Sequence, residues 1–480
     1  MSQDEEPISE ANPNINTVYE TPRNQFRVTV EFPMFLVMLS LSLAGVAVSN
    51  IILYRTCWHS LNHTQAECKI FLSPVKSNTS QELEDEVQKY VTFVTTVKTV
   101  IESVAPAILS LFLGVWSDTH GRKPLVTWPL LGISGTAGLI VIYSMTENLG
   151  PWWYIITLIP LSLTGGFSVL FTGVFCYISD ITSADKRSLR MTLLEAGVSA
   201  GSVIGAVLSS YVIRLVGNVY LLLISATLSV IAYAFTAVCI DESLPSVEQG
   251  GFSKVLDIEH VKEMFRKCFK KRPNHGRAQI LLLSFANSLS IFILYGLMGL
   301  EYLYTRHKLH WALKQYTTFS AVSTTIFFFG SIFGVMVVQK LLRVTDLALA
   351  TIAFMSVTLE YLIKTFAVTT WHMYLSVALS LFRGLSAPLI RSLITKILPG
   401  DDIAKVFALM CAIEGICPLI SPALYNSLYE VTLSTFPGAI YVLSSSITAF
   451  CAVCLIIVQY YRWRVPTIIY ENIEPEETVS

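Results

Sequence analysis

Three glutamates, Glu195, Glu301 and Glu414, lie inside or at the edge of long apolar stretches, and no basic residue stands four positions from any of them. A charged side chain is costly in lipid, so each is a functional candidate. A carboxyl group deprived of water favours its protonated form and can load and release a proton near neutral pH. We therefore predict proton coupling at Glu195 and Glu414. Glu301 is a cavity candidate, with simple hydration near the outer end as the alternative.

Two arginines, Arg383 and Arg391, flank Pro388 in another apolar stretch. The planar fork of a guanidinium group can bind a carboxylate through two parallel hydrogen bonds. The two arginines are therefore predicted to bind the acidic group of an anionic substrate.

Two pairs of opposite charge stand four residues apart inside apolar stretches: Lys98 with Glu102, and Glu360 with Lys364. This spacing places both partners on one face of a helix, where they can neutralise each other. A structural ion pair is at least as good an interpretation as a transport role. Lys98 and Glu102 remain candidates for the cavity.

The segment 114–124 (GVWSDTHGRKP) lies between two apolar stretches and is similar to a loop signature of major facilitators. Glycine permits a tight turn, basic residues hold the cytosolic side, and an aspartate can pair with basic groups or a helix N-terminus. The sequence thus predicts a gating loop, with a purely topological role as the alternative. Its proposed residues are Gly114, Asp118, Gly121, Arg122 and Lys123.

The composition explains why buried charges matter in this chain of 480 residues. Apolar residues make up 53% and charged residues 14%, against about 25% charged in an average soluble domain. Because lipid offers the backbone no hydrogen-bond partner, apolar spans must be helices or closed barrels, and no strand-like alternation suggests a barrel. We predict an all-α major facilitator fold of about twelve helices in two six-helix bundles. The expected spans are 32–53, 91–115, 125–145, 152–178, 192–213, 219–240, 279–303, 317–339, 346–366, 371–395, 404–426 and 436–460.

The lipid bilayer is an expected partner of the chain. Basic residues in the connecting segments predict the orientation of the chain in that bilayer. They favour both termini in the cytosol and the first loop outside. The resulting division is a cytosolic tail (1–31), an N-terminal bundle (32–240) with an outer loop (54–90), a basic cytosolic linker (241–278), a C-terminal bundle (279–460) and a cytosolic tail (461–480). The first tail lacks the apolar stretch of a signal peptide.

The outer loop carries two glycosylation sequons, at Asn62 and Asn78, together with Cys57 and Cys68. If the loop faces an oxidising lumen, a disulfide between the two cysteines can form, and free thiols are the alternative. Basic and acidic residues nearly balance over the whole chain, whose net charge is −1. The absence of a basic excess argues against a nucleic-acid partner. The scattered histidines predict no metal site, and no cofactor is expected.

Several segments in one order resemble the proton-coupled folate transporter family (solute carrier family 46). They are 180–196 (DITSADKRSLRMTLLEA), 387–396 (APLIRSLITK), 425–429 (YNSLY) with 436–438 (FPG), and 84–89 (EDEVQK). The resemblance implies a proton-coupled importer of organic anions such as folates, steroid conjugates or muropeptides.

The resemblance also implies roles for single residues: Glu195 in proton coupling, Asp118 and Arg122 in the gate, and Arg391 on the tenth span. The chain departs from the folate member, which has an aspartate where Gly165 and Gly166 stand. That member also has an arginine near Leu158 and a histidine near Tyr295, which makes Tyr295 a cavity candidate. The family's disulfide from the first outer loop to the fourth lacks its second cysteine here, so a Cys57–Cys68 bond, or none, is suggested.

We therefore expect a proton-driven symporter for small organic anions rather than an enzyme, since no catalytic motif is supported. A non-transporting receptor or scaffold on the same fold is the alternative, because fold does not fix activity. The plasma membrane is the expected location, with lysosomal or endosomal membranes as the alternative; the tail motif at Tyr470 fits endocytic sorting. The sequence does not predict the oligomeric state.

Overall fold

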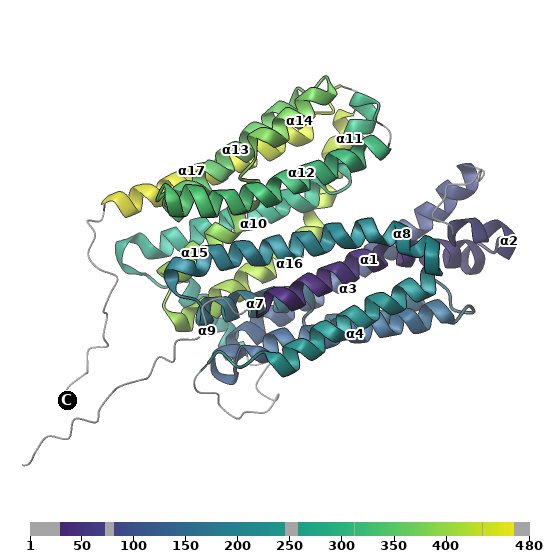
Figure 1. The fold of residues 1–480 in the computed structure, drawn as a ribbon, viewed down its shortest axis with the longest axis horizontal. Helices are drawn as coiled ribbons and strands as arrows, with labels where there is room; N and C mark the ends of the chain where they lie inside the picture. Colours follow the sequence, from purple (N-terminus) through teal and green to yellow (C-terminus); the bar gives the residue numbers. More distant parts are fainter. Residues whose placement is uncertain (1–28, 73–80, 245–257, 312, 434, 465–480) are drawn as a thin grey trace, which may run out of the picture.

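The computed structural model describes residues 29–72, 81–244, 258–311, 313–433 and 435–464, and within these ranges it contains helices but no strand (Figure 1). Asn78, most of both tails including Tyr470, and the middle of the linker lie outside the described residues.

The N-terminal bundle is built from helices that follow the first six expected spans. Their bounds are α1 (Glu31–Arg55), α3 (Gln81–His120), α4 (Lys123–Met145), α5 (Trp153–Thr157), α6 (Ile159–Leu163), α7 (Gly166–Ile181) and α8 (Ala184–Cys239). Short helices η1 (Thr56–Ser60), α2 (Gln65–Cys68) and η2 (Lys69–Leu72) form the first part of the loop that the sequence predicts to lie outside. The linker contains α9 (Ile258–Phe269) and η4 (Pro273–His275).

The C-terminal bundle covers the remaining expected spans and lies above the N-terminal one in Figure 1. Its elements are α10 (Gly276–Leu297), α11 (Leu300–Leu309), α12 (Leu313–Phe333), η5 (Gly334–Leu341), α13 (Asp346–Thr365), α14 (Thr370–Leu379), η6 (Arg383–Leu385), α15 (Ser386–Ile397), α16 (Gly400–Thr432) and α17 (Ala439–Arg464).

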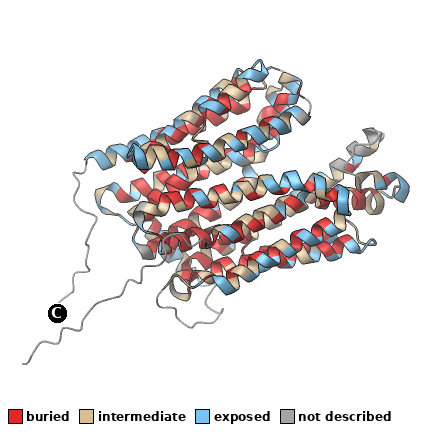
Figure 2. Ribbon diagram, in the orientation of Figure 1, coloured by how far each residue is buried: buried red, intermediate tan, exposed pale blue. Residues whose placement is uncertain are grey.

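Lengths and composition agree with a membrane protein. Among the described residues, ten helical segments are long and apolar enough to cross a bilayer. The pair α14 and η6–α15, bent by 42°, supplies another span, and α7 is a shorter apolar helix. Exposed faces point outward (Figure 2) and carry large apolar side chains such as Ile142 and Leu208. Such faces suit lipid, so the predicted all-α fold is confirmed.

Four expected spans differ from continuous, separate helices. The fourth is broken into α5, α6 and α7, and the break before α7 lies at Gly165, whose φ of 88° is a left-handed conformation that only glycine adopts easily. The fifth and sixth share α8, interrupted at Gly217. The seventh ends at Leu297 instead of continuing to residue 303, which places Glu301 on the separate helix α11.

The two bundles meet where α16 packs on α3 and α7, and where α15 and α12 pack on α8. We call one end of the molecule, formed by residues 117–123, 184–190 and 398–405, the motif end. The other end, which holds residues 56–72 and α11, is the disulfide end. Figure 1 shows α9 near the first and α2 and α11 near the second.

Candidate functional site

A cavity of about 430 Å³ lies between the bundles. Among the described residues of the N-terminal bundle, those that line it are Thr192, Glu195, Ala196 and Ser199 of α8. The rest of its wall comes from α10 to α13, the η6–α15 segment and α17. Apolar rings, many hydroxyl groups and a few charged side chains face it together, as expected of a site for a small polar molecule.

The guanidinium of Arg391, on α15, connects the two bundles. It forms an ion pair with Glu195 of α8 and a second one, of 3.4 Å, with Glu414 of α16. It also lies over the ring of Phe175 on α7, 4.2 Å from the centroid. In the part of the chain that the structure describes, Glu195 and Glu414 have no basic partner within their own helices, as the sequence indicates, but both pair with Arg391 on another helix.

Arg391 is buried, whereas the side chain of Glu195 is 28% exposed and that of Glu414 is 13% exposed. Asn287 of α10 donates a further hydrogen bond to Glu414. Within this group one positive charge faces two carboxylates, so one negative charge lacks a basic counterpart when both are ionised. Glu195 lines the cavity and Arg391 does not.

A second charged group lies in the C-terminal bundle. Glu360 and Lys364 of α13 form the expected pair at 2.7 Å. Glu360 also binds Arg383 at 2.7 Å, and Lys364 binds Glu301 at 2.6 Å. Glu301 is therefore an ion-pair partner and not merely hydrated. Arg383 lines the cavity, as a substrate-binding residue must, but it already has a carboxylate partner.

The predicted gating loop forms an ion network at the motif end. Asp118 pairs with Arg122 at 2.8 Å and with Lys405 of α16 at 3.6 Å, so the network crosses the bundle interface. Arg122 also reaches Asp180 of α7 at 3.2 Å. Two hydrogen bonds close the same end: Arg187 Nη1 donates to the Thr395 carbonyl, and Gln339 donates to Ser188.

Glycines permit this close packing. Gly121 turns the chain with a φ of 103°, and a Cβ atom on Gly114 would overlap that of Ala408 on α16. Sequence reasoning missed Glu242, whose carboxylate accepts the backbone N–H groups of Arg122 and Lys123 at 2.7 and 3.0 Å. A carboxylate at the start of α4 suits the positive end of the helix dipole.

Three other candidates lie away from the cavity. Lys98 and Glu102 pair with each other on α3 at 3.1 Å. Neither they nor Tyr295 belong to the cavity wall. The spacing of four residues therefore identified a pair correctly but did not indicate which way it faces.

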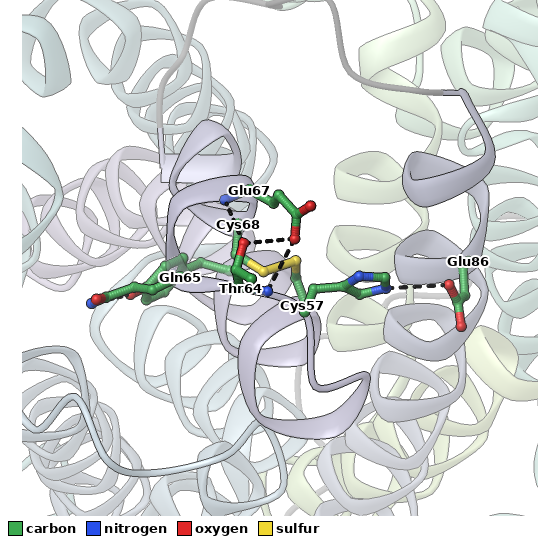
Figure 3. Close-up of a disulfide and its surroundings, with 8 residues drawn as sticks. Cys57, Thr64, Gln65, Glu67, Cys68 and Glu86 are labelled. Carbon is green, nitrogen blue, oxygen red and sulfur yellow. Dashed lines mark hydrogen bonds and ion pairs between the residues drawn. A yellow bond between two sulfur atoms is a disulfide. The ribbon is translucent and has the colours of Figure 1, made fainter.

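The described part of the predicted outer loop is held by a disulfide between Cys57 and Cys68 (Figure 3). Beside it, the hydroxyl of Thr64 accepts from the backbone of Glu67, and the carboxylate of Glu67 accepts from the backbone of Thr64, a reciprocal cap at the start of α2. Hydrogen bonds from the Thr64 hydroxyl and backbone lower the pKa of Glu67. Asn62 is exposed on this loop.

A sequence model of the family described as Major Facilitator Superfamily matches residues 34–422. The chain belongs to the Major Facilitator Superfamily. Among solved structures it is similar to the human organic anion transporter MFSD10 (TETRAN), with a TM-score of 0.68 and 14% identity over 89% of this chain and 97% of that one. At this identity the likeness shows the fold alone.

Curated relatives in this superfamily confirm the resemblance to solute carrier family 46. The chain is 29% identical to the probable peptidoglycan muropeptide transporter SLC46 of Drosophila melanogaster, over 86% of this chain and 82% of that one. It is 23% identical to the proton-coupled folate transporter of Rattus norvegicus (88% and 90% covered). It is 24% identical to the lysosomal proton-coupled steroid conjugate and bile acid symporter SLC46A3 of Gallus gallus (91% and 94%).

Proposed function

We propose that this chain is a proton-coupled symporter that imports small organic anions by alternating access. The observation that carries the proposal is the sharing of Arg391 between Glu195 and Glu414 at the bundle interface. A proton on either carboxyl balances the surplus negative charge, which is costly in a poorly hydrated place. The names of the relatives, two of which are called proton-coupled, support the proposal of proton coupling.

Proton binding and substrate binding are linked through the same guanidinium in this mechanism. A proton on Glu195 weakens its pair with Arg391, and the fork of Arg391 can then accept the acidic group of the substrate. Because that pair joins α8 to α15, its loss also frees the bundles, taken as residues 32–240 and 279–460, to rock about the cavity.

The network of Asp118, Arg122 and Lys405 acts as the gate of the motif end, which we propose faces the cytosol together with both termini. In the described conformation this end is closed by contacts between the bundles. The plasma membrane is the proposed location. A lysosomal or endosomal membrane is the alternative, which the name of the chicken relative supports.

The proposal is tested by uptake of labelled folate, estrone sulfate and muramyl dipeptide at about pH 5.5 and about pH 7.4, on either side of the range in which a desolvated carboxyl can titrate. We expect at least one probe to enter faster at the lower external pH, and Glu195→Gln to abolish that difference. Glu102→Gln is the matched control, because Glu102 pairs with Lys98 and does not line the cavity.

Uptake that does not depend on pH, or a Glu195→Gln variant with full pH dependence, contradicts proton coupling. A folded chain that admits none of the probes favours the receptor or scaffold alternative.

A further inference from the structure

The charged group of Glu301, Glu360, Lys364 and Arg383 has an internal asymmetry. One oxygen of Glu360 accepts from both cations, at 2.7 Å each, and the Glu360 side chain is 0% exposed. Glu301 touches only Lys364 in this group, and its side chain is 25% exposed. Glu360 is thus the fixed counter-ion of both cations, whereas Glu301 is a second, accessible partner.

The position of Glu301 in the chain makes it replaceable. It lies in the first turn of α11, directly after the break between α10 and α11 at Met298 and Gly299. Glu360 instead lies one helical turn from Lys364 within α13. Displacing Glu301 therefore requires a change of side-chain conformation or a small movement of α11, whereas displacing the buried Glu360 would break its contacts with both cations at once.

Charge balance shows what would take the place of Glu301. Two cations and two carboxylates cancel in the intact group, so withdrawal of Glu301 leaves one positive charge without a counter-ion. Glu301, Lys364 and Arg383 all line the cavity, whereas Arg391 does not. An acidic group that enters the cavity in this conformation therefore encounters Lys364 and Arg383 first.

We propose that Lys364 and Arg383 form an anion subsite for a carboxylate group of the transported molecule, and that the carboxylate of Glu301 occupies this subsite until the ligand displaces it. The inference rests on the proposed transport function and specifies where the acidic group binds in the described conformation, before the Arg391–Glu195 pair opens. Lys364 offers an ammonium group and Arg383 part of its guanidinium fork, which are suitable donors for a carboxylate.

The walls of the subsite indicate what accompanies that carboxylate. Tyr361 accepts a hydrogen bond from Arg383 at 2.9 Å, and the guanidinium lies 5.3 Å from the ring centroids of both Phe327 and Tyr361. These contacts fix the orientation of Arg383. Nearby hydroxyl groups on Ser331 and Ser386 also line the cavity. The ligand class is thus an organic acid with hydrogen-bonding groups and an apolar part.

The test measures binding to the purified full-length protein, so it does not depend on transport. The probes are muramyl dipeptide and the same compound with its carboxyl group amidated. Glu301→Gln should lower the Kd of the acid form about tenfold, the effect of one ionic hydrogen bond, and leave the Kd of the amide unchanged. Lys364→Gln should weaken binding of the acid form only. If Lys364→Gln does not fold, Arg383→Lys takes its place. This variant keeps the charge but loses the guanidinium fork, so it should weaken binding of the acid form only.

Glu102→Gln is again the control and should change neither Kd. The inference is overturned if Glu301→Gln changes the acid and the amide equally, or changes neither. It is also overturned if the acid form binds neither the wild type nor Glu301→Gln. Failure of the transport proposal looks different: Glu301→Gln then separates acid from amide in the binding assay, while uptake shows no dependence on pH or on Glu195.

Discussion

The guanidinium of Arg391 on α15 forms an ion pair with the carboxylate of Glu195 on α8, and this salt bridge joins the two helical bundles. Both residues come from stretches that the sequence marked as functional. Neither stretch indicated that they meet, because 196 positions separate them.

The first prediction concerns the energy of this pair. Removing one partner of a buried pair leaves an uncompensated charge, so Arg391→Gln should destabilise the protein more than the double variant Arg391→Gln/Glu195→Gln. A double-mutant cycle on thermal unfolding in detergent should give a coupling of about 1–3 kcal/mol. The matched cycle on Lys98 and Glu102, which are 33% and 26% exposed, should give less than about 1 kcal/mol. Equal couplings would contradict the special position of Arg391.

The second prediction concerns closure of the motif end. Gly114→Val should push α3 away from α16, because added side-chain atoms would overlap Ala408. The motif end should then open more often. A cysteine introduced by Leu189→Cys, at a buried apolar position of that end, should react several-fold faster with a maleimide.

Gly138→Val is the control for this experiment, since a Cβ atom on Gly138 meets no atom within 4 Å. Labelling that rises equally in both variants would show a general loss of structure rather than a gate. An unchanged rate in Gly114→Val would show that the contact with Ala408 does not hold the end closed.

The third prediction concerns the disulfide. The Cys57–Cys68 bond closes a short segment, with a sequence separation of 11. In the chain-entropy account, closing a loop of this size stabilises it by about 2–3 kcal/mol. A reducing agent should therefore increase hydrogen exchange in residues 56–72. The variant Cys57→Ser/Cys68→Ser should show the faster exchange without the reductant, and Cys239→Ser, at an exposed free cysteine, should behave as the wild type.

The fourth prediction concerns the orientation of the disulfide end. Asn62 is exposed and lies in a sequon, so a loop outside the cytosol should carry a glycan there. Asn62→Gln should remove one step of the mobility shift that glycosidase treatment produces. His63→Ala keeps the sequon and should keep the glycan. A glycan-free Asn62 in the wild type would argue for the reverse orientation.

The fifth prediction concerns pH at α2. The pKa of Glu67 is lowered from its ordinary 4.5 by the hydrogen bonds from Thr64. A lowered pKa stabilises the cap above the unfolded value, and the effect is lost only as the pH falls toward the folded value. The protection from hydrogen exchange that the charged cap gives to α2 should therefore be the same at neutral pH and at about pH 5.5. Glu67→Gln, which cannot ionise, sets the baseline without the charged cap, and a cap already lost at about pH 5.5 would contradict the assignment.

The fold was largely predictable because lipid imposes one simple requirement, long apolar helices, on every span. The exceptions occur where tertiary packing decides the backbone. The break at Gly165 and Gly166 brings that turn against Pro106 of α3, and nothing in the local hydropathy indicates it. The same holds for the end of α10 at Leu297.

The sequence predicted which charged residues belong to the site, but not which of them form ion pairs with each other. Pairs four apart, such as Glu360 and Lys364, follow directly from helix geometry. Pairs between helices, such as Glu301 with Lys364, depend on how the bundle is assembled and leave no trace in the local sequence. Glu242 was missed for the same reason, because it acts on the start of α4, 120 positions away from Arg122.

The unequal construction of the cavity has a consequence for how such proteins diversify. Since α8 is the one described element of the N-terminal bundle in the wall, new cargo preferences can arise through substitutions in α10, α12 and α13. Those helices leave the Asp118–Lys405 contact untouched. A chimaera that exchanges only α10, α12 and α13 between two relatives should therefore inherit the selectivity of the donor.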